Sequence, residues 1–469
     1  MEEEQKPALC LFEDDRYTNF LPLDLNRPIF DLFIGTQTLG RRIIAEIGPE
    51  KVVFLCRDYL AGVVRESAAC DEGETVVLVN ETVDEDTIFI NGRLLAYGNE
   101  LGELIALLDS EKIIHKKGVP VAARLMGPNA VSFIERLTAS HGDDAVVKDL
   151  HAIRDTSAKQ ETRVSKKNMM KEPVEDGWAI SWAEEQKVKI EETGLKLLSY
   201  YWQLIEENSN CIRDDFEKSP LRGSSPDSAL FQGVDLINEE DIVIGAEVEV
   251  RSGTVLDASE GPIVIADGAS IEPNAIINGP CYVGKRSIIR GGAKIGHGTS
   301  IGLECRIGGE VEESIISPYT NKQHEGFLGH SYIGSWVNIG AGSCNSDLKN
   351  NYSPVSAWCA GRMKNTGRTF LGAVIADHSK IAINTGLNTG TVIGFNTNIL
   401  TTCFPPKFVP SFTWELEPEL EPEPVEFKLD KALKTAQIMM DRRNVNCSEK
   451  MAGLLKTIHR FCKQSGRTI

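Results

Sequence analysis

The chain has 469 residues, of which 41% are hydrophobic and 25% are charged, an ordinary balance for a globular protein of two or three domains. Its 50 basic and 68 acidic residues give a formal net charge of −18. That charge argues against a nucleic-acid-binding protein, because phosphate backbones need a basic face, but it allows a basic pocket for a small phosphorylated molecule.

The sequence carries no signal for export or for a membrane. Its first residues, MEEEQKPALC, are acidic, and no run reaches the ~18 apolar residues that span a bilayer. The eleven cysteines lie scattered, without CxxC pairs or histidine partners at metal-site spacing. We therefore expect free thiols in a cytoplasmic protein, with neither nucleic acid nor membrane as a partner.

Short apolar runs alternate with amphipathic segments as far as about residue 125. The predicted strands are 8–12, 51–56, 75–80 and 87–91, and the predicted helices are 38–47 and 59–67. This alternation predicts an α/β domain with a mostly parallel sheet.

Polar loops follow the predicted strands at 13–16, 57–58, 80–81 and 91–93. Function in such sheets usually lies beyond the carboxyl ends of the strands, so the four loops would be a candidate site if they gather at one edge. Each loop alone is equally typical of an exposed turn. A polar insertion at 155–180 and a helix at 195–210 lead on to the next domain.

A six-residue repeat dominates the second half of the chain. Every sixth residue is aliphatic and β-branched at Ile265, Ile271, Ile277, Val283, Ile289, Ile295, Ile301 and Ile307. The step also appears upstream at Ile244, Val250 and Leu256, and downstream at Ile375, Ile381, Leu387, Ile393 and Ile399. Such a period fits neither a helix nor simple strand alternation, and it predicts a parallel β-helix with aliphatic residues pointing into a narrow core.

Two stretches interrupt the repeat: SPYTNKQHEGF after Ile316, and residues 344–369. A solenoid can eject loops without breaking its core, and such loops usually lie on the binding face, so we expect a site here rather than a plain scaffold. Beyond the repeat, a Pro/Glu spacer precedes two amphipathic helices, with Ser448 as the predicted N-cap of the second. These helices are expected to pack on the solenoid end or on a neighbouring subunit.

The order of an α/β domain, a hexapeptide solenoid and the stretch GFLGHSYIGSWVNIGAGSCNSDLKNNY resembles the bifunctional uridylyltransferase/acetyltransferase family. LFEDDRYTNFLPLDLNRPIFDLFIGTQTLGRRI resembles a divergent bacterial branch of it, the sugar nucleotidyltransferases. The resemblance covers nearly the whole chain. It implies acetylation of glucosamine 1-phosphate with acetyl-CoA, followed by coupling to UTP to give UDP-N-acetylglucosamine.

The resemblance implies a fold and domain boundaries. A nucleotidyltransferase-like, Rossmann-like α/β domain is expected at 1–215, and a left-handed parallel β-helix of hexapeptide repeats at 216–412. The spacer and the C-terminal helices would occupy 413–469. Solenoid acyltransferases of this kind are implied to be homotrimers.

In the acetyltransferase half, the family uses a histidine just before a Tyr-aliphatic-Gly motif as the base. Tyr332 opens that motif here, His330 lies two residues before it, where three is usual, and His324 is the reserve candidate. A neutral imidazole suits proton transfer near pH 7. Asn338 matches a family asparagine.

The resemblance implies further contacts. The second family asparagine is matched by Asn345 or Asn350, with Lys349 nearby for phosphate. Gly340 and Ala341 match backbone positions that contact the acetyl-CoA arm, whereas Ala373 replaces a serine that the family keeps. A basic cluster of Arg362, Lys364 and Arg368 suits CoA or sugar phosphates and is equally typical of a solvated loop.

The N-terminal half departs further from the family. The glycine-rich phosphate loop is replaced by EDDRY, which cannot form the usual cradle of backbone amides. Arg16 matches the family arginine and Arg27 can replace its lysine, while Asn91 and Arg93 stand where a metal-binding aspartate is expected.

A magnesium ion for nucleotidyl transfer would therefore need Glu13, Asp14 or Asp15, and the sequence defines no metal ligands. The favoured function is transfer of acetyl and nucleotidyl groups to a sugar phosphate. Two alternatives stay open: an acyltransferase only, and a non-catalytic protein that senses sugar nucleotides.

Overall fold

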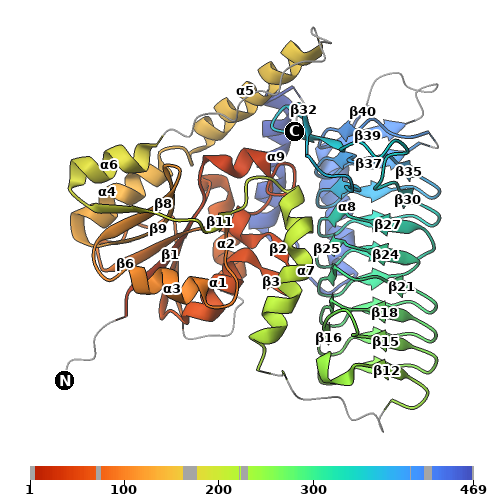
Figure 1. Ribbon diagram of the computed structural model, residues 1–469. Helices are drawn as coiled ribbons and strands as arrows, with labels where there is room; N and C mark the ends of the chain where they lie inside the picture. The colour runs from red at the N-terminus through yellow and green to blue at the C-terminus, as the bar shows by residue number, and fades with distance from the viewer. Residues whose placement is uncertain are drawn as a thin grey trace.

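The computed structural model describes residues 6–69, 75–161, 177–220, 222, 231–401, 403–416 and 425–466. Within these ranges an N-terminal α/β body lies beside a long, ladder-like solenoid (Figure 1). A search of the same ranges for a helix long and apolar enough to cross a bilayer finds none.

The α/β body is built on a seven-stranded sheet in the order β10-β8-β9-β6-β1-β4-β5. Its strands are β1 (Ala8–Phe12), β4 (Lys51–Leu55), β5 (Val76–Val79), β6 (Thr87–Asn91), β8 (Lys112–Lys116), β9 (Val119–Leu125) and β10 (Lys189–Glu192). The four predicted strands are parallel neighbours. The sheet is mostly parallel, as predicted, and β9 is its one antiparallel strand among the described residues, pairing with β6 and β8. Lys117 and Gly118 join β8 to β9 with left-handed backbone angles, which gives a tight hairpin.

Helices cover this sheet and link it to the solenoid. They are α1 (Leu39–Ile47), α2 (Ala61–Ala68), α3 (Glu100–Leu107), α4 (Gly127–Thr138), α5 (Asp143–Glu161), α6 (Trp178–Gln186) and α7 (Trp202–Glu217), with 3-10 turns η1 (Asp15–Asn19), η2 (Ile29–Asp31) and η3 (Asp58–Leu60). The helix expected at 195–210 begins later, because β11 (Lys196–Leu197) pairs with β7 (Leu94–Leu95). Residues 162–176 of the predicted insertion lie outside the described ranges.

Three parallel sheets form the sides of the solenoid. The six-strand face holds β12 (Asp235–Ile237), β15 (Val255–Asp257), β18 (Ile276–Asn278), β21 (Lys294–Ile295), β24 (Glu310–Glu312) and β27 (Phe327–Gly329), and the pair β30 (Cys344–Asn345) and β35 (Gly386–Leu387) follows it. The nine-strand face holds β13 (Ile242–Ile244), β16 (Ile263–Ile265), β19 (Cys281–Val283), β22 (Thr299–Ile301), β25 (Ile315–Ile316), β28 (Tyr332–Ile333), β33 (Val374–Ile375), β36 (Val392–Ile393) and β38 (Phe408–Val409). The ten-strand face holds β14 (Glu249–Val250), β17 (Ser270–Ile271), β20 (Ile288–Ile289), β23 (Arg306–Ile307), β26 (Asn321–Lys322), β29 (Asn338–Ile339), β34 (Lys380–Ile381), β37 (Asn398–Leu400), β39 (Thr413–Leu416) and β40 (Val425–Glu426).

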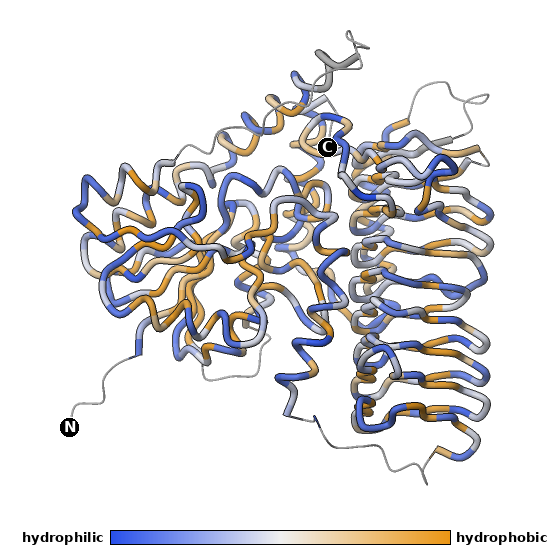
Figure 2. The backbone as a smooth tube through the Cα atoms, viewed as in Figure 1, coloured by the Kyte–Doolittle hydropathy of each residue, from blue (hydrophilic) through white to orange (hydrophobic). Residues whose placement is uncertain are grey.

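The predicted aliphatic repeat is the core of this solenoid. On the nine-strand face, Ile265, Val283 and Ile301 stack in register from one coil to the next and are fully buried. Small residues such as Ala269 and Ala293 are buried between these columns. The hexapeptide solenoid predicted from the sequence is thus confirmed, and Figure 2 shows apolar residues recurring along its coils.

The first predicted interruption is not an ejected loop. Asn321 and Lys322 form β26, which pairs with β23 and β29 and continues the ten-strand face. Lys322 takes the inward position that Ile307 fills one coil earlier, and its ammonium group donates to the carbonyls of Gly308 (2.7 Å) and His324 (3.1 Å). The stem of the lysine replaces an aliphatic side chain, and the two carbonyls satisfy its buried head.

The second interruption does leave the solenoid. An antiparallel bridge between Leu348 and Phe370 joins its two ends. Between them the chain forms a hairpin of β31 (Ser356–Cys359) and β32 (Arg362–Asn365) that contacts α5 of the α/β body (Figure 1).

The α/β body covers the nine-strand face. The hydroxyl of Tyr332 accepts a hydrogen bond from the amide of Phe33 (3.0 Å) and donates to the carbonyl of the same residue (3.2 Å). The hydroxyl of Ser300 donates to the carbonyl of Gly35 (2.6 Å). Aromatic and aliphatic residues from both halves form one cluster around these bonds.

The C-terminal helices are α8 (Leu429–Asp441) and α9 (Glu449–Gln464). As predicted, Ser448 caps α9 by accepting a hydrogen bond from the amide of Met451 (3.1 Å). Helix α9 packs on α2 and α5 of the α/β body, and it also reaches the solenoid end, where His459 contacts Phe412 and pairs with Glu426 of β40 (2.8 Å). The spacer residues 417–424 lie outside the described ranges, and β39 and β40 on either side of them pair antiparallel.

Burial lowers the pKa of Lys322 to about 8. The pKa of an unfolded lysine is near 10.4. Between about pH 8 and pH 10.4, the unfolded chain therefore keeps a proton on Lys322 that the folded chain has lost. The free energy of unfolding should therefore rise by about 1.5 kcal/mol from pH 8 to 9.5 in wild type relative to Lys322→Met, measured by urea titration. The exposed-lysine control Lys285→Met should keep the wild-type rise, and an equal pH profile for wild type and Lys322→Met would contradict the account.

Candidate functional sites

The polar loops after β1, β4 and β6 meet at one edge of the sheet. The buried carboxylate of Glu13, after β1, accepts hydrogen bonds from the guanidinium of Arg57, after β4, and from the amide of Ile29 (2.9 Å). Arg57 also pairs with Asp24 (3.3 Å). Burial raises the pKa of Asp24 to about 7 although Arg57 opposes the rise. These fully buried groups neutralise one another and hold the edge together.

The second carboxylate of this edge is also paired. Asp14 accepts hydrogen bonds from Nε of Arg93 (2.8 Å) and from the amide of Asn91 (2.8 Å). Burial by itself would raise the pKa of Asp14, but Arg93 and Asn91 outweigh it and hold the pKa below its usual value. Asn91 and Arg93, predicted to bind substrate, thus position Asp14 instead.

The fit of this edge to magnesium is poor. Glu13 and Asp14 are held by arginines, and the carboxylate of Asp15 accepts a hydrogen bond from the hydroxyl of Ser140 (3.3 Å). Among the described residues, no group of three histidine, cysteine or acidic side chains is placed to hold a metal ion. No catalytic step through a bound metal is derived from this arrangement.

Beside this edge lies a cavity of about 420 Å³. Asp14, Asp15 and the predicted Arg16 line it on the η1 side, and α4 contributes Arg136. Arg27, the other predicted arginine of this half, lies elsewhere: it forms an ion pair with Asp377 and so joins the α/β body to the solenoid.

The predicted histidine His330 has an acidic partner. It follows β27 at the corner between the six-strand and nine-strand faces, with left-handed backbone angles. Its Nδ1 lies 2.8 Å from Oδ2 of Asp347, and its ring stacks on Phe370 with centroids 4.9 Å apart. Both members of the pair are partly exposed. The pairing fixes the ring and turns Nε2 away from the carboxylate.

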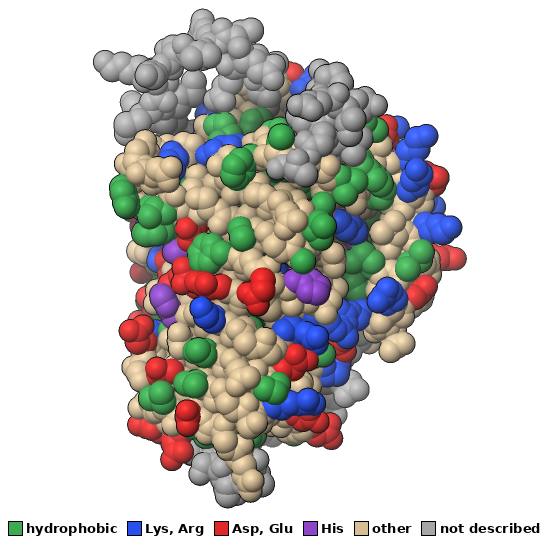
Figure 3. Space-filling view, turned by 90° about the vertical axis from the view of Figure 1, so that its right-hand side faces the viewer, with side chains coloured by type: hydrophobic (Ala, Val, Ile, Leu, Met, Phe, Trp, Pro, Cys, Tyr) green, Lys and Arg blue, Asp and Glu red, His purple; other side chains and the backbone are tan. Residues whose placement is uncertain are grey.

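Sequence reasoning missed Asp347. It lies 17 residues after His330, close to the length of one coil, so the two stack at the same corner. Glu313 and His297 continue this column, with His297 Nε2 3.1 Å from the Glu313 carboxylate. Burial raises the pKa of Glu313, and His297 and His330 oppose the rise. Histidine and acidic side chains also stand out on the solenoid side in Figure 3.

The polar groups of two other predicted residues of this region, Tyr332 and Asn345, are buried in hydrogen bonds within the protein. The hydroxyl of Tyr332 is buried against Phe33, and the buried amide of Asn345 both accepts from and donates to the backbone of Gly329 (2.9 Å each). Neither side chain reaches solvent, so we no longer assign Tyr332 a catalytic role or Asn345 a substrate contact. Asn345 holds the backbone next to His330, and Tyr332 holds its coil against the α/β body.

The remaining predicted acetyl-transfer residues lie on another side of the solenoid. Asn338 lies on the ten-strand face, beside Asn321 and Lys380 in the neighbouring strands. Gly340, Ala341 and the exposed His324 follow at the corner where that face meets the six-strand face. The six-strand face therefore separates these residues from His330 within one chain.

Arg362, Lys364 and Arg368, the predicted basic cluster, do not all lie at one place. Arg362 and Lys364 line the 420 Å³ cavity of the α/β body. Arg368 forms an ion pair with Glu206 of α7, and Lys349 donates to the carbonyl of Pro354 (2.6 Å). Because Arg362 and Lys364 face the α/β cavity and not the acetyl-transfer motif, the assignment of this cluster to CoA is corrected.

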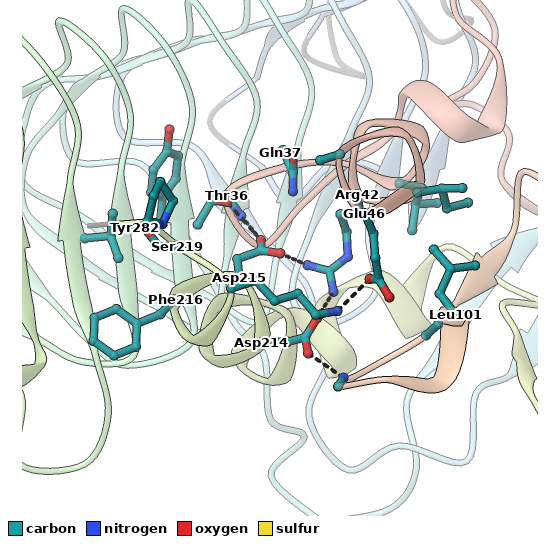
Figure 4. Close-up of a pocket in the computed structure, with 18 of the residues that line it drawn as sticks. Thr36, Gln37, Arg42, Glu46, Leu101, Asp214, Asp215, Phe216, Ser219 and Tyr282 are labelled. Atoms are coloured by element: carbon teal, nitrogen blue, oxygen red, sulfur yellow. Dashed lines mark hydrogen bonds and ion pairs between the residues drawn. The ribbon is translucent and has the colours of Figure 1, made fainter. Parts of the chain in front are cut away.

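Another cavity, of about 670 Å³, lies between α1 and α7 (Figure 4). Its charged groups pair with one another. Arg42 bridges Asp214 (2.8 Å) and Asp215, and Lys218 bridges Asp214 (2.9 Å) and Glu46 (2.8 Å). These ion pairs hold the end of α7 against α1 of the α/β body, and we assign them a structural role.

Two parts of the chain match known protein families. Residues 9–220 match the family described as sugar nucleotidyl transferase, and residues 262–297 match the bacterial transferase hexapeptide family, six repeats. The N-terminal part of the chain is thus similar to sugar nucleotidyl transferases, and a stretch of the solenoid is similar to transferase hexapeptide repeats. The resemblance predicted from the motifs is thereby confirmed, and so is the predicted combination of folds.

Several curated relatives are named bifunctional protein GlmU. That of Carboxydothermus hydrogenoformans is 30% identical over 155 residues, which cover 28% of this chain and 34% of the relative. That of Wigglesworthia glossinidia brevipalpis is 27% identical over 190 residues, covering 39% and 37%. The chain thus spans about a third of the length of these relatives. The match to a solved structure of Arabidopsis UDP-N-acetylglucosamine acyltransferase is 13% identical in sequence. It covers 49% of this chain and 95% of that chain, with a TM-score of 0.18.

Arg42→Ala should lower the free energy of unfolding by roughly 3–5 kcal/mol, because it leaves Asp215 buried without its cation and leaves Asp214 with Lys218 alone. Chemical denaturation monitored by circular dichroism measures the loss. The neighbouring Arg41→Ala, an exposed position on the same helix, should change stability by no more than about 0.5 kcal/mol. Equal stability of the two variants would rule out a structural role for the ion pairs of Arg42.

Proposed function

We propose that this chain is a bifunctional transferase that acts on a sugar phosphate. The solenoid would acetylate an amino-sugar phosphate similar to glucosamine 1-phosphate, using acetyl-CoA as a substrate. The N-terminal domain would then couple a nucleotide, from UTP or a similar triphosphate, to the sugar 1-phosphate. The His330–Asp347 pair at the break in the solenoid carries the first half, and the two family matches support the combination.

Acetyl transfer needs a base beside the attacking amine. With Asp347 on its Nδ1, His330 presents Nε2 to accept the proton that the amine loses as its nitrogen bonds to the thioester carbon. The carbon–sulfur bond then breaks, and the proton passes to the leaving thiolate of CoA. Asp347 acts by positioning the ring and by stabilising the charged imidazolium.

The separation of the predicted residues supports the proposal of a homotrimer. His330 and Asn338 lie on different sides of one solenoid, so a substrate that contacts both needs a second copy of the chain. Large apolar side chains are exposed in and next to the second interruption and in the coils that follow it, namely Tyr352, Phe370, Ile383 and Phe404. Burial of such side chains is a common basis for closed oligomers. The scattered cysteines, free where the structure describes them, support a cytoplasmic location.

Two observations bear on the N-terminal activity in opposite directions. The basic cavity at the sheet edge favours nucleotide binding, whereas the pairing of Glu13 and Asp14 with arginines leaves few carboxylates for a metal-bound triphosphate. The second observation favours the alternative in which this domain senses a sugar nucleotide without turning it over.

His330→Ala should reduce acetyl transfer about 10²- to 10⁴-fold in kcat, since it removes the general base. Asp347→Asn should give a smaller loss, because the ring keeps a hydrogen-bond partner but loses the stabilising charge. Thiol release from acetyl-CoA with a panel of amino-sugar phosphates measures both. Full activity in His330→Ala together with loss in His324→Ala would transfer the role to His324, and inactive wild type would end the acetyltransferase proposal.

The nucleotidyl half is tested by pyrophosphate release from UTP and dTTP with a sugar 1-phosphate, with and without Mg²⁺. We expect release that requires the sugar phosphate, and substitution of Arg16 by alanine should weaken it because the cavity loses a cation. Nucleotide binding without any release would establish the sensing alternative.

A further inference from the structure

The β31–β32 hairpin leaves the solenoid and docks on the N-terminal domain. Its tip, Ala360-Gly361, has left-handed backbone angles at both positions, which form a tight turn. A side chain at Gly361 would collide with the carbonyl of Ile153 in α5, so the tip is pressed onto that helix. Ala357 and Cys359 of β31 are buried in the cluster that joins the two halves of the molecule, and Trp358 packs against that cluster.

Specific contacts hold the hairpin there. The hydroxyl of Tyr201 donates to the carbonyl of Trp358 (2.6 Å), and the ring of Trp358 stacks on Phe408 with centroids 4.4 Å apart. Cys359 is buried with its sulfur 3.7 Å from the carbonyl of Asn19, in the η1 loop. The hairpin is therefore anchored on both the solenoid side and the N-terminal side.

This docking brings two cations to the cavity beside the η1 loop. Arg362 and Lys364 are two residues apart on β32, so they point to the same side of the strand, and both line the cavity. The ammonium group of Lys364 lies 4.0 Å from the centroid of the Tyr200 ring, and Tyr200 in turn stacks on Trp202. The second strand of the hairpin thus forms part of the cavity wall.

The cavity lining fits a nucleotide. Its cations are Arg16, Arg136, Arg362 and Lys364, and its carboxylates are Asp14, already paired with Arg93, and Asp15. In a chain with a net charge of −18, this gathering of cations marks a local anion site. Trp178 also lines the cavity and offers an apolar ring to a base or a sugar, whereas the Tyr200 ring is already covered by Trp202 and Lys364. Phosphate groups together with a flat ring are the chemistry of a nucleoside triphosphate or a nucleotide sugar.

We propose that the solenoid hairpin completes the nucleotide site of the N-terminal domain, with Arg362 and Lys364 binding the phosphate groups. The inference rests on the proposed nucleotidyl function for the identity of the ligand. It adds that two of the four cations that the described residues bring to that cavity come from the other domain. The EDDRY loop cannot form the glycine-rich phosphate cradle, and the hairpin supplies positive charge that the altered loop lacks.

The test is isothermal titration of the full-length chain with UTP, dTTP and inorganic triphosphate. Arg362→Gln/Lys364→Gln should weaken triphosphate and nucleotide binding at least about 10-fold and reduce its salt dependence, because two charge-assisted contacts are lost. Arg362→Lys/Lys364→Arg keeps both charges and should stay within about 3-fold of wild type. Arg251→Ala/Lys294→Ala, which removes an arginine and a lysine exposed elsewhere on the solenoid, should bind as wild type.

The titrations distinguish loss of the hairpin's contribution from a lack of nucleotide binding by the N-terminal domain. If wild type binds UTP and the glutamine variant binds equally well, the hairpin does not contribute to the site and the inference is overturned. If wild type binds none of the three probes, the nucleotide function of the N-terminal domain fails, and the inference with it. A glutamine variant that melts more than a few degrees below wild type is replaced by the single variants, each expected to lose part of the affinity.

Discussion

The hydroxyl of Tyr332 joins the two halves of this molecule. It exchanges two hydrogen bonds with the backbone of Phe33, inside an apolar cluster that covers the nine-strand face of the solenoid. Such a buried hydroxyl is costly unless both its donor and acceptor roles are met, so the bonds fix how the faces meet. Because the N-terminal domain lies on this face, the other two faces are the ones left for substrate or for further copies of the chain.

This packing determines where chemistry is possible. His330 lies at the edge of the covered face, where Asp347 holds its ring in a partly exposed position. The excursion that begins after Asp347 does not return directly to the next coil but first passes over the N-terminal domain as the β31–β32 hairpin. The same break in the repeat thus provides the acid partner of the histidine and a wall of the second cavity.

Much of the fold was predictable because its signals are local. An aliphatic side chain every sixth residue specifies the inward column of the solenoid, and short apolar runs specified β1, β4, β5 and β6. Lys322 escaped this reasoning, because a lysine at an inward position is recognisable only when carbonyls are seen to meet its ammonium group. The mostly parallel sheet was predicted, but its antiparallel strand β9 was not.

The candidate sites were less predictable because they depend on contacts distant in sequence. The motif around His330 was found from its neighbours, but its partner Asp347 becomes evident only when one coil is laid on the next. Arg362 and Lys364 were recognised from the sequence as a basic cluster, yet only the docking of the hairpin shows that they line the same cavity as Arg16. Tyr332 matched a family motif, while its burial follows from a domain contact that no motif encodes.

The central claim is that the two domains share one nucleotide site. A crystal structure of the full-length chain with UTP or a nonhydrolysable analogue tests it most directly. We predict phosphate oxygens within hydrogen-bonding distance of Arg362 and Lys364 from the solenoid and of Arg16 from the N-terminal domain. A nucleotide bound elsewhere on the N-terminal domain, with the hairpin cations making no contact to its phosphates, would contradict the account.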